Sequence, residues 1–221
     1  MNQEKYKYKL FGRAKGRKKR KNYISYEYFL DKDTLDTNYN IDPHDYNILD
    51  IGSGNGENSI FLSINNPNSK IISMDIFEDG NINLHNEILN QKITNILIYP
   101  DNALKFFDNI KIDTFVDELW ILFPDPWPKK RHNKRRLINI DFLKKVRYFL
   151  KKNANLFIAT DSTEYLESII INIYKLKDLY LWKNQDPLNW HYRYLNLPAT
   201  KFSKKAEKSN RKSIFLQLKK I

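Results

Sequence analysis

The segment of the sequence with the clearest chemistry combines one acid, one tryptophan and a run of cations. It reads FPDPWPKKRHNKRR over residues 123–136. Three alternating prolines exclude a helix and predict an extended, rigid path that holds Asp125 in place. Cations beside a fixed carboxylate are typical of a phosphate track that leads to a reaction site. The cations are Lys129, Lys130, Arg131, Lys134, Arg135 and Arg136.

A second candidate site is a cluster of glycines in the segment ILDIGSGNGE of residues 48–57. Gly52, Gly54 and Gly56 predict a tight turn between a strand and a helix, where a ligand can lie against the backbone. The spacing GxGxG departs from the GxGxxG of dinucleotide sites. Asp50 would repel a pyrophosphate but suits the ammonium group of a methionine moiety, directly or through water. The pattern therefore favours S-adenosylmethionine (SAM) over NAD, with a turn that binds no ligand as the alternative.

Two further polar positions follow the next apolar runs. Asp75 ends the run KIISMD about 20 residues after the glycines, where doubly wound folds place a carboxylate on ribose hydroxyls. Asp101 and Asn102 follow the third run, in position to meet the adenine amino group. An ordinary strand-end cap or Asx turn is the alternative for all three residues.

The strands and helices that position these residues can be predicted from the sequence, in which short apolar runs alternate with segments of helical period. This alternation predicts an α/β fold with a mostly parallel sheet, helices on both faces and an antiparallel final strand. We expect one domain over residues 46–221, with a final hairpin that includes residues 213–218. The expected strands are 46–51, 70–75, 94–99, 114–123 and 154–160, and the expected helices are 57–64, 81–91, 138–152 and 163–175.

Composition limits the classes of function. The net charge of +12 over 221 residues favours a polyanionic partner. Residues 1–45 are expected to form a partly flexible basic arm that contacts this partner, with seven Lys or Arg between Arg13 and Lys21; a solvated tail is the alternative. The absence of cysteine excludes disulfides and thiolate metal sites. Without a signal peptide or an apolar run of spanning length, we expect a soluble, cytoplasmic protein.

Taken together, these motifs resemble the bacterial tRNA (guanine-N7-)-methyltransferase family. The family's hallmark FPDPW(H/P)KKRHxKRR stands here as FPDPWPKKRHNKRR, from Phe123 to Arg136. Further matches are ATD at residues 159–161, TKF at residues 200–202 and the basic segment FGRAKGRK at residues 11–18. These segments extend over most of the chain.

The resemblance implies a Rossmann-like class I methyltransferase fold, SAM as donor and the variable-loop guanine of tRNA as acceptor. Asp50, Asp75 and the Asp101–Asn102 pair would line the cofactor site, and Asp125 would be the acid at the reaction centre. The substrate contacts would be Lys129, Asp161, Thr200, Lys201, Phe202 and Ser203. The chain departs from the family at Asn102, where an acid is common, at Ser203, where Glu is usual, and at Asp50, where many relatives have Glu.

N7 of guanine carries an available lone pair, so that methylation requires no prior proton removal. We expect Asp125 to hold the base by its N–H edge and to offset the charge that methylation creates. Trp127 would either stack on the base or pack within its loop. The four histidines show no ligand spacing, so no metal is expected. The protein would act as a monomer or homodimer, without an obligatory protein partner or membrane contact.

Two alternatives remain open at this point. One is a methyltransferase of the same fold that acts on another RNA, another base or a small molecule. The other is a catalytically silent tRNA-binding protein, which the intact glycine segment and Asp125 disfavour. A membrane-surface protein would also explain the charge, but the sequence contains no amphipathic basic helix.

Overall fold

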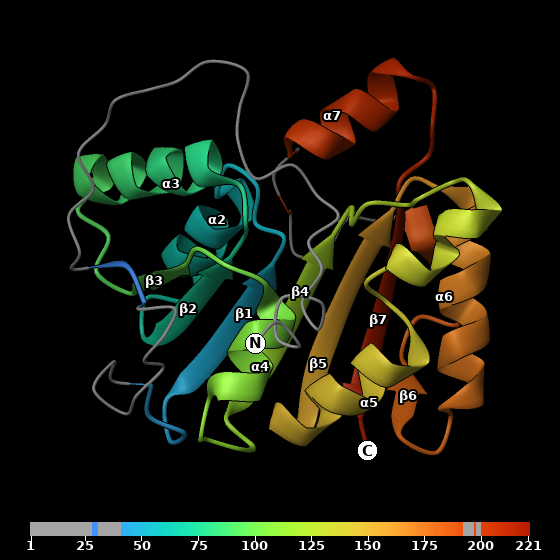
Figure 1. The fold of residues 1–221 in the computed structure, drawn as a ribbon, viewed down its shortest axis with the longest axis horizontal. Helices are drawn as coiled ribbons and strands as arrows, with labels where there is room; N and C mark the ends of the chain where they lie inside the picture. The colour runs from blue at the N-terminus through green and yellow to red at the C-terminus, as the bar shows by residue number, and fades with distance from the viewer. Residues whose placement is uncertain (1–27, 31–40, 192–196, 198–199) are drawn as a thin grey trace, which may run out of the picture. The chain divides into compact units, whose positions relative to one another are not determined.

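The computed structural model of the chain describes residues 28–30, 41–191, 197 and 200–221, and only the backbone of Lys201 and Phe202. The chain divides into two compact units, residues 1–113 and residues 114–221 (Figure 1). The basic run from Arg13 to Lys21 lies outside the described residues.

The first unit contains three parallel strands in the order β3-β2-β1. Continuous apolar runs form them, and almost every side chain in them is buried or half-buried, as expected for parallel strands covered on both faces. The expected positions of all three are confirmed to within two residues at either end. The strands are β1 (Tyr46–Ile51), β2 (Ser69–Met74) and β3 (Ile96–Tyr99).

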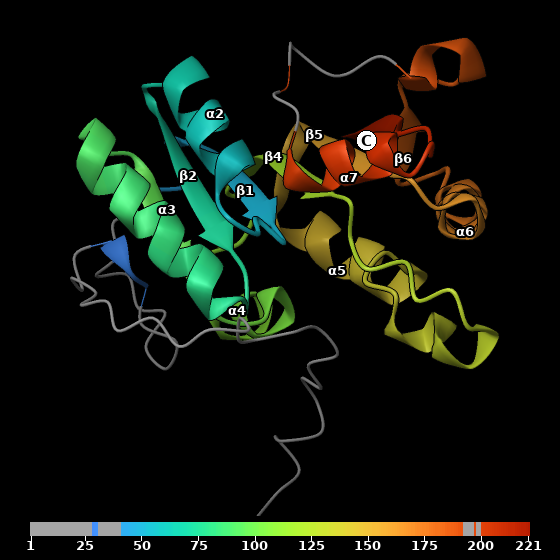
Figure 2. The same ribbon diagram turned by 90° about the horizontal axis from the view of Figure 1, so that it is seen from above.

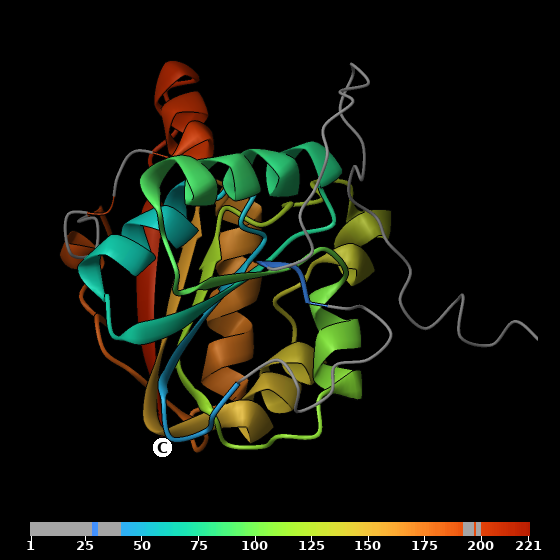
Figure 3. The same cartoon turned by 90° about the vertical axis from the view of Figure 1, so that its left-hand side faces the viewer.

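Helices surround these strands on both sides. They are α2 (Glu57–Asn65), α3 (Glu78–Gln91) and α4 (Ala103–Asn109). Helix α2 packs on β2 and against α3, and α2 and α4 lie on opposite sides of the strands (Figures 2 and 3). Helix α4 was not expected, because its seven residues are too short to show a helical period in the sequence.

A short part of the N-terminal range packs on the first unit. Phe29 forms a parallel bridge with Ile98, and the Leu30 amide donates to the Ile98 carbonyl at 2.8 Å. The Leu30 side chain is buried. These residues belong to the range 1–45 that we expected to be a basic arm, so at least this short part of it is joined to β3.

The second unit combines parallel and antiparallel pairing. Strand β4 (Val116–Leu122) pairs in parallel with β5 (Leu150–Thr160). Strand β7 (Ile214–Lys220) lies antiparallel between β5 and β6 (Tyr180–Trp182). The α/β class, with a mostly parallel sheet and an antiparallel final strand, is therefore confirmed. The expected final hairpin is wrong, because two helical segments separate β6 from β7 along the chain.

Of the two helices expected in the second unit, one has the expected bounds and the other ends early. Helix α6 (Thr163–Lys175) has the expected bounds and packs on β5. The helix expected over residues 138–152 is wrong at its end, because α5 stops at Phe149 and the extended backbone of Leu150 begins β5. The remaining segments are η3 (Lys130–Arg135), η4 (Pro187–His191) and α7 (Lys201–Lys208). Among the described helices, none is both long and apolar enough to cross a membrane.

Candidate functional site

The glycine loop, residues 52–56, follows β1 and has the expected conformation. Gly52, Gly54 and Gly56 have φ angles of 76°, 61° and 84°, values in the left-handed region that other residues adopt only with strain. The Gly52 amide donates to the Met74 carbonyl at 2.7 Å. A Cβ at Gly52 would meet no atom within 4 Å, so the backbone there is open to a ligand.

Asp75 is joined to this loop by hydrogen bonds. It follows the last residue of β2, at the same edge of the parallel strands as the glycine loop. The Gly54 amide donates to Oδ2 of Asp75 at 2.7 Å, and the Phe77 amide donates to Oδ1 at 2.9 Å. The carboxylate thus fixes the glycine loop to the end of β2.

Asp50 is buried beneath the glycine loop. Its carboxylate accepts from Nδ2 of Asn58 at 3.0 Å and from Oγ of Ser59 at 2.6 Å. Burial raises the pKa of Asp50 to about 6, against the lowering effect of these two bonds. The side chain is 1% exposed, so this conformation favours an indirect action on a ligand over a direct contact.

Helix α3 forms the support of the glycine loop. A Cβ on Gly80 would lie 1.9 Å from the Gly54 carbonyl oxygen, and one on Gly56 would lie 2.5 Å from the Leu84 side chain. Nδ2 of Asn83 donates to the Asn55 carbonyl at 3.2 Å. Sequence reasoning missed this contact, although an isolated glycine in a helical pattern often has a packing reason.

Asp101 and Asn102 follow β3 and are both half-buried. Oδ1 of Asn102 caps α4 by accepting from the Leu104 amide at 2.8 Å. Asp101 pairs with Lys105 across 3.4 Å and accepts from the Asn102 amide at 2.7 Å. The Asx-turn alternative is therefore present in the structure at Asn102, and the Asp101 carboxylate is held by two contacts.

In the second unit, Asp125 follows β4 on an irregular loop over residues 123–129. Its side chain is exposed, but the protein packed around it raises its pKa by desolvation. The expected extended path is interrupted at two residues, because Phe123 and Trp127 have φ angles of 53° and 44°. Both residues precede a proline, which disfavours the right-handed helical region.

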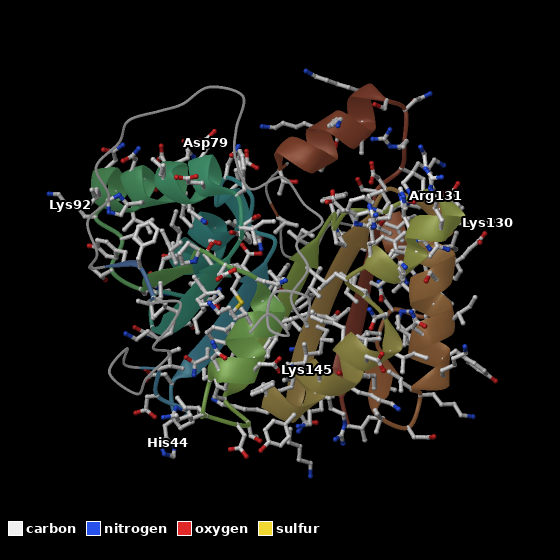
Figure 4. The ribbon with its side chains drawn as sticks, viewed as in Figure 1. His44, Asp79, Lys92, Lys130, Arg131 and Lys145 are labelled. Atoms are coloured by element: carbon white, nitrogen blue, oxygen red, sulfur yellow. The ribbon has the colours of Figure 1, made fainter. Side chains whose placement is uncertain are left out.

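Most cations after this loop face solvent. Lys129, Lys130, Arg131 and Lys134 are exposed, and the side chains of Lys130 and Arg131 project outward (Figure 4). The Arg135 guanidinium lies 4.9 Å from the centre of the Trp127 ring. The half-buried Trp127 also contacts the His132 ring edge-on, so in this structure it packs within the loop.

Arg136 differs from its neighbours because it is buried, with 6% of its surface exposed. Its Nε donates to the Pro126 carbonyl at 2.8 Å, and a terminal nitrogen donates to the Glu164 carbonyl at 3.2 Å. The guanidinium lies 5.2 Å from the centre of the Tyr165 ring. The expectation that all six cations belong to a phosphate track is therefore wrong for Arg136.

The remaining substrate candidates lie at the end of β5 and the start of α7. Asp161 forms an ion pair with Arg211 at 2.8 Å. Oγ1 of Thr200 caps α7 by accepting from the Ser203 amide at 3.2 Å, and Oγ of Ser203 donates to the Thr200 carbonyl at 3.0 Å. Ser203 is buried, so its hydroxyl serves the helix cap. The side chains of Lys201 and Phe202 lie outside the described residues.

The first unit has groups that fit a nucleoside with a cationic tail. The glycine loop offers open backbone at Gly52, and the acids Asp75 and Asp101 follow the strands at the same edge. Within the described residues, no group of three or more His, Asp or Glu side chains could hold a metal ion. The expected cofactor residues thus all belong to the first unit, and the expected substrate residues all belong to the second.

Most of the chain is similar to known methyltransferases. Residues 44–216 match a family model described as a putative methyltransferase. A tRNA (guanine-N(7)-)-methyltransferase of Wolbachia pipientis is 35% identical over 77% of this chain and 73% of its own length. The corresponding protein of Buchnera aphidicola is 33% identical over 78% and 72%. A bifunctional methyltransferase of Rickettsia conorii is 34% identical over 78% of this chain and 32% of its own length.

Solved structures share the fold. An rRNA methylase from Streptococcus thermophilus matches with a TM-score of 0.55 and 15% identity, over 80% of this chain and 87% of its own. An antibiotic-related methyltransferase matches with a TM-score of 0.54 and 21% identity, over 86% and 94%. The Rossmann-like class I methyltransferase fold expected from the sequence is therefore confirmed.

Proposed function

Because the chain belongs to the tRNA (guanine-N(7)-)-methyltransferase family, we propose that it transfers the methyl group of SAM to N7 of the variable-loop guanine in tRNA. The observation that carries the proposal is the loop of Asp125, which directly follows β4 and continues into a row of exposed cations. This loop combines a carboxylate that can orient a base with charges that can bind the RNA backbone.

Asp125 is proposed as the catalytic residue. SAM supplies an electrophilic methyl group, and guanine N7 supplies its own lone pair, so no base is needed to remove a proton. The exposed Asp125 carboxylate can accept the N–H edge of the guanine and offset the positive charge that develops on the methylated base. Its fixed loop would hold the base in one orientation, which removes part of the entropic barrier.

The first unit is proposed to bind SAM. Gly52, Gly54 and Gly56 allow the ligand to approach the backbone, Asp75 would accept ribose hydroxyls, and Asp101 or Asn102 would meet the adenine. The buried charge of Asp50 would act on the methionine ammonium through the intervening loop or water.

For tRNA, we propose phosphate contacts by the exposed cations Lys129, Lys130, Arg131 and Lys134. The end of β5 and the start of α7 would lie beside the bound RNA, with contacts from Asp161, Thr200, Lys201, Phe202 and Ser203. The basic residues within the range 1–45 would add contacts to the backbone. Because tRNA is matured in the cytoplasm of bacteria, we place the activity there.

The direct test offers one labelled methyl donor to several acceptors. The protein is incubated with labelled SAM and unmodified tRNA, ribosomal RNA or free guanosine, and the product base is mapped by cleavage at 7-methylguanine. We expect label only in tRNA, at the variable-loop guanine. Label in ribosomal RNA or at another base would contradict the proposed substrate and identify a different one. SAM-dependent thermal stabilisation without transfer would indicate a silent binding protein.

A further inference from the structure

Arg136 is the one cation of the run 129–136 whose side chain is buried. A buried guanidinium requires partners, because an unpaired charge in the protein interior is strongly destabilising. The two preceding cations differ from it, because Lys134 is exposed and Arg135 is half-buried. The burial of Arg136 therefore reflects its particular contacts and not the general character of the segment.

These contacts join three segments of the second unit. Nε of Arg136 donates to the carbonyl of Pro126, the residue after Asp125, at 2.8 Å. A second nitrogen donates to the Glu164 carbonyl at the start of α6 at 3.2 Å. A charged donor gives a shorter and stronger bond to a carbonyl than a neutral donor does. The guanidinium thus fastens the peptide beside Asp125 to a helix that begins 38 residues further along the chain.

Tyr165 strengthens the same junction. Its ring lies beneath the Arg136 guanidinium at 5.2 Å, and its hydroxyl accepts from the Ile138 amide at 2.8 Å. Burial raises the pKa of Tyr165 well above its usual range, so the phenol stays neutral and keeps this bond. Tyr165 therefore contacts both the Arg136 side chain and the backbone two residues after it.

The loop of Asp125 needs such support. Phe123 and Trp127, two residues before and two after Asp125, both have left-handed φ angles. Non-glycine residues persist in this region only where surrounding contacts over-determine the backbone. The Asp125 side chain is exposed, so the loop is restrained by the contacts of the residues on either side, among them the Pro126 carbonyl.

We propose that Arg136 is a positioning residue for Asp125, which clamps the Pro126 carbonyl to α6 and does not bind tRNA phosphates. The inference deepens the proposed function and rests on it. It predicts that loss of the two hydrogen bonds from the guanidinium slows methyl transfer, while the affinity for tRNA and its salt dependence stay the same. A phosphate contact would show the opposite pattern.

The test uses Arg136→Lys, which keeps the charge but replaces the planar guanidinium by a single nitrogen. Arg147→Lys is the matched control, since Arg147 also donates to a backbone carbonyl, that of Ile221. Lys134→Ala is the contrasting variant at an exposed cation. For each, we measure the single-turnover rate at saturating tRNA and SAM, the tRNA dissociation constant against salt concentration, and the rise in Tm with SAM.

For Arg136→Lys we expect a rate about 10- to 100-fold lower, with tRNA affinity and SAM stabilisation like those of the wild type. Arg147→Lys should keep the wild-type rate. Lys134→Ala should weaken tRNA binding and reduce the salt slope by about 0.7–0.9. Should the lysine variant not fold, Arg136→Gln, which keeps N–H donors without charge, is measured in the same way.

Two results would overturn the inference. One is a wild-type rate for Arg136→Lys, and the other is an Arg136 variant that lowers the salt slope as Lys134→Ala does. A wild-type protein that forms no 7-methylguanine would instead overturn the proposed function, so the two failures are distinguishable.

Discussion

The backbone of Gly54 and the α-carbon of Gly80 are in direct contact, since a Cβ on Gly80 would lie 1.9 Å from the Gly54 carbonyl oxygen. The first turn of α3 and the glycine loop are therefore packed without any side chain between them. Asn83, one turn further, adds a hydrogen bond to the same loop. The shape of the glycine loop thus depends on a residue outside the glycine motif.

Gly80→Ala is expected to displace the glycine loop and to weaken SAM binding. A methyl group has no room there, so the loop must shift. Because overpacking of this kind typically costs about 1–3 kcal/mol, we expect SAM to bind about tenfold or more weakly. Calorimetric titration with SAM measures the effect. Asn90→Ala, on the exposed face of α3, is the control and should bind like the wild type. Equal affinity for Gly80→Ala would show that α3 does not set the loop.

Asp50 predicts a pH dependence of stability. Its pKa is raised from 3.8 to about 6 in the folded protein. Between these pH values the folded state holds a proton that the unfolded state has released, so the contribution of Asp50 to stability falls as pH rises through this window and stays low above it. Asp50→Asn removes this titration, because an amide does not ionise in this pH range.

Relative to the wild type, Asp50→Asn should therefore gain stability from pH 4 to pH 7, on the order of 2–3 kcal/mol. Denaturant-induced unfolding at several pH values measures this difference, and the exposed Asp178→Asn serves as control. A stability difference that does not change with pH would contradict the raised pKa.

Thr200 caps α7, and this contact should contribute to the stability of the second unit. Thr200→Ala removes the acceptor for the Ser203 amide and should destabilise the second unit by about 1 kcal/mol. Thr200→Ser keeps the hydroxyl and should restore stability. Urea unfolding compares the two variants. If the serine variant is stable but loses transfer activity, the threonine methyl group has a further role at the substrate.

The strands and the glycine loop could be predicted from sequence because their determinants are local. Buried parallel strands appear as continuous apolar runs, and β1 and α6 have the expected bounds. The end of α5 could not be predicted, since Leu150 continues the apolar period of the helix while its partner Val116 pulls it into β5. Tertiary pairing decided this boundary over local pattern.

Among the site residues too, features that depend on local sequence could be predicted, and those that depend on tertiary partners could not. The pattern of the loop at residues 123–136 indicated where Asp125 lies but not which cation is buried, because the partner of Arg136 is a carbonyl in α6, 28 residues away. Asp50 was expected to act on a ligand directly or through water, and its carboxylate is buried against Asn58 and Ser59 of the following helix. Side-chain partners of this kind leave no periodic signal in the sequence.

The most direct test of the mechanism measures methyl transfer and SAM binding in the same preparations of Asp125→Asn and Asp125→Ala. We predict a single-turnover rate on tRNA at least about 100-fold lower, with a SAM dissociation constant within about twofold of the wild type. Asp141→Asn, an exposed acid at the start of α5, should transfer at the wild-type rate. A wild-type rate for either Asp125 variant would contradict the role of this carboxylate in the reaction.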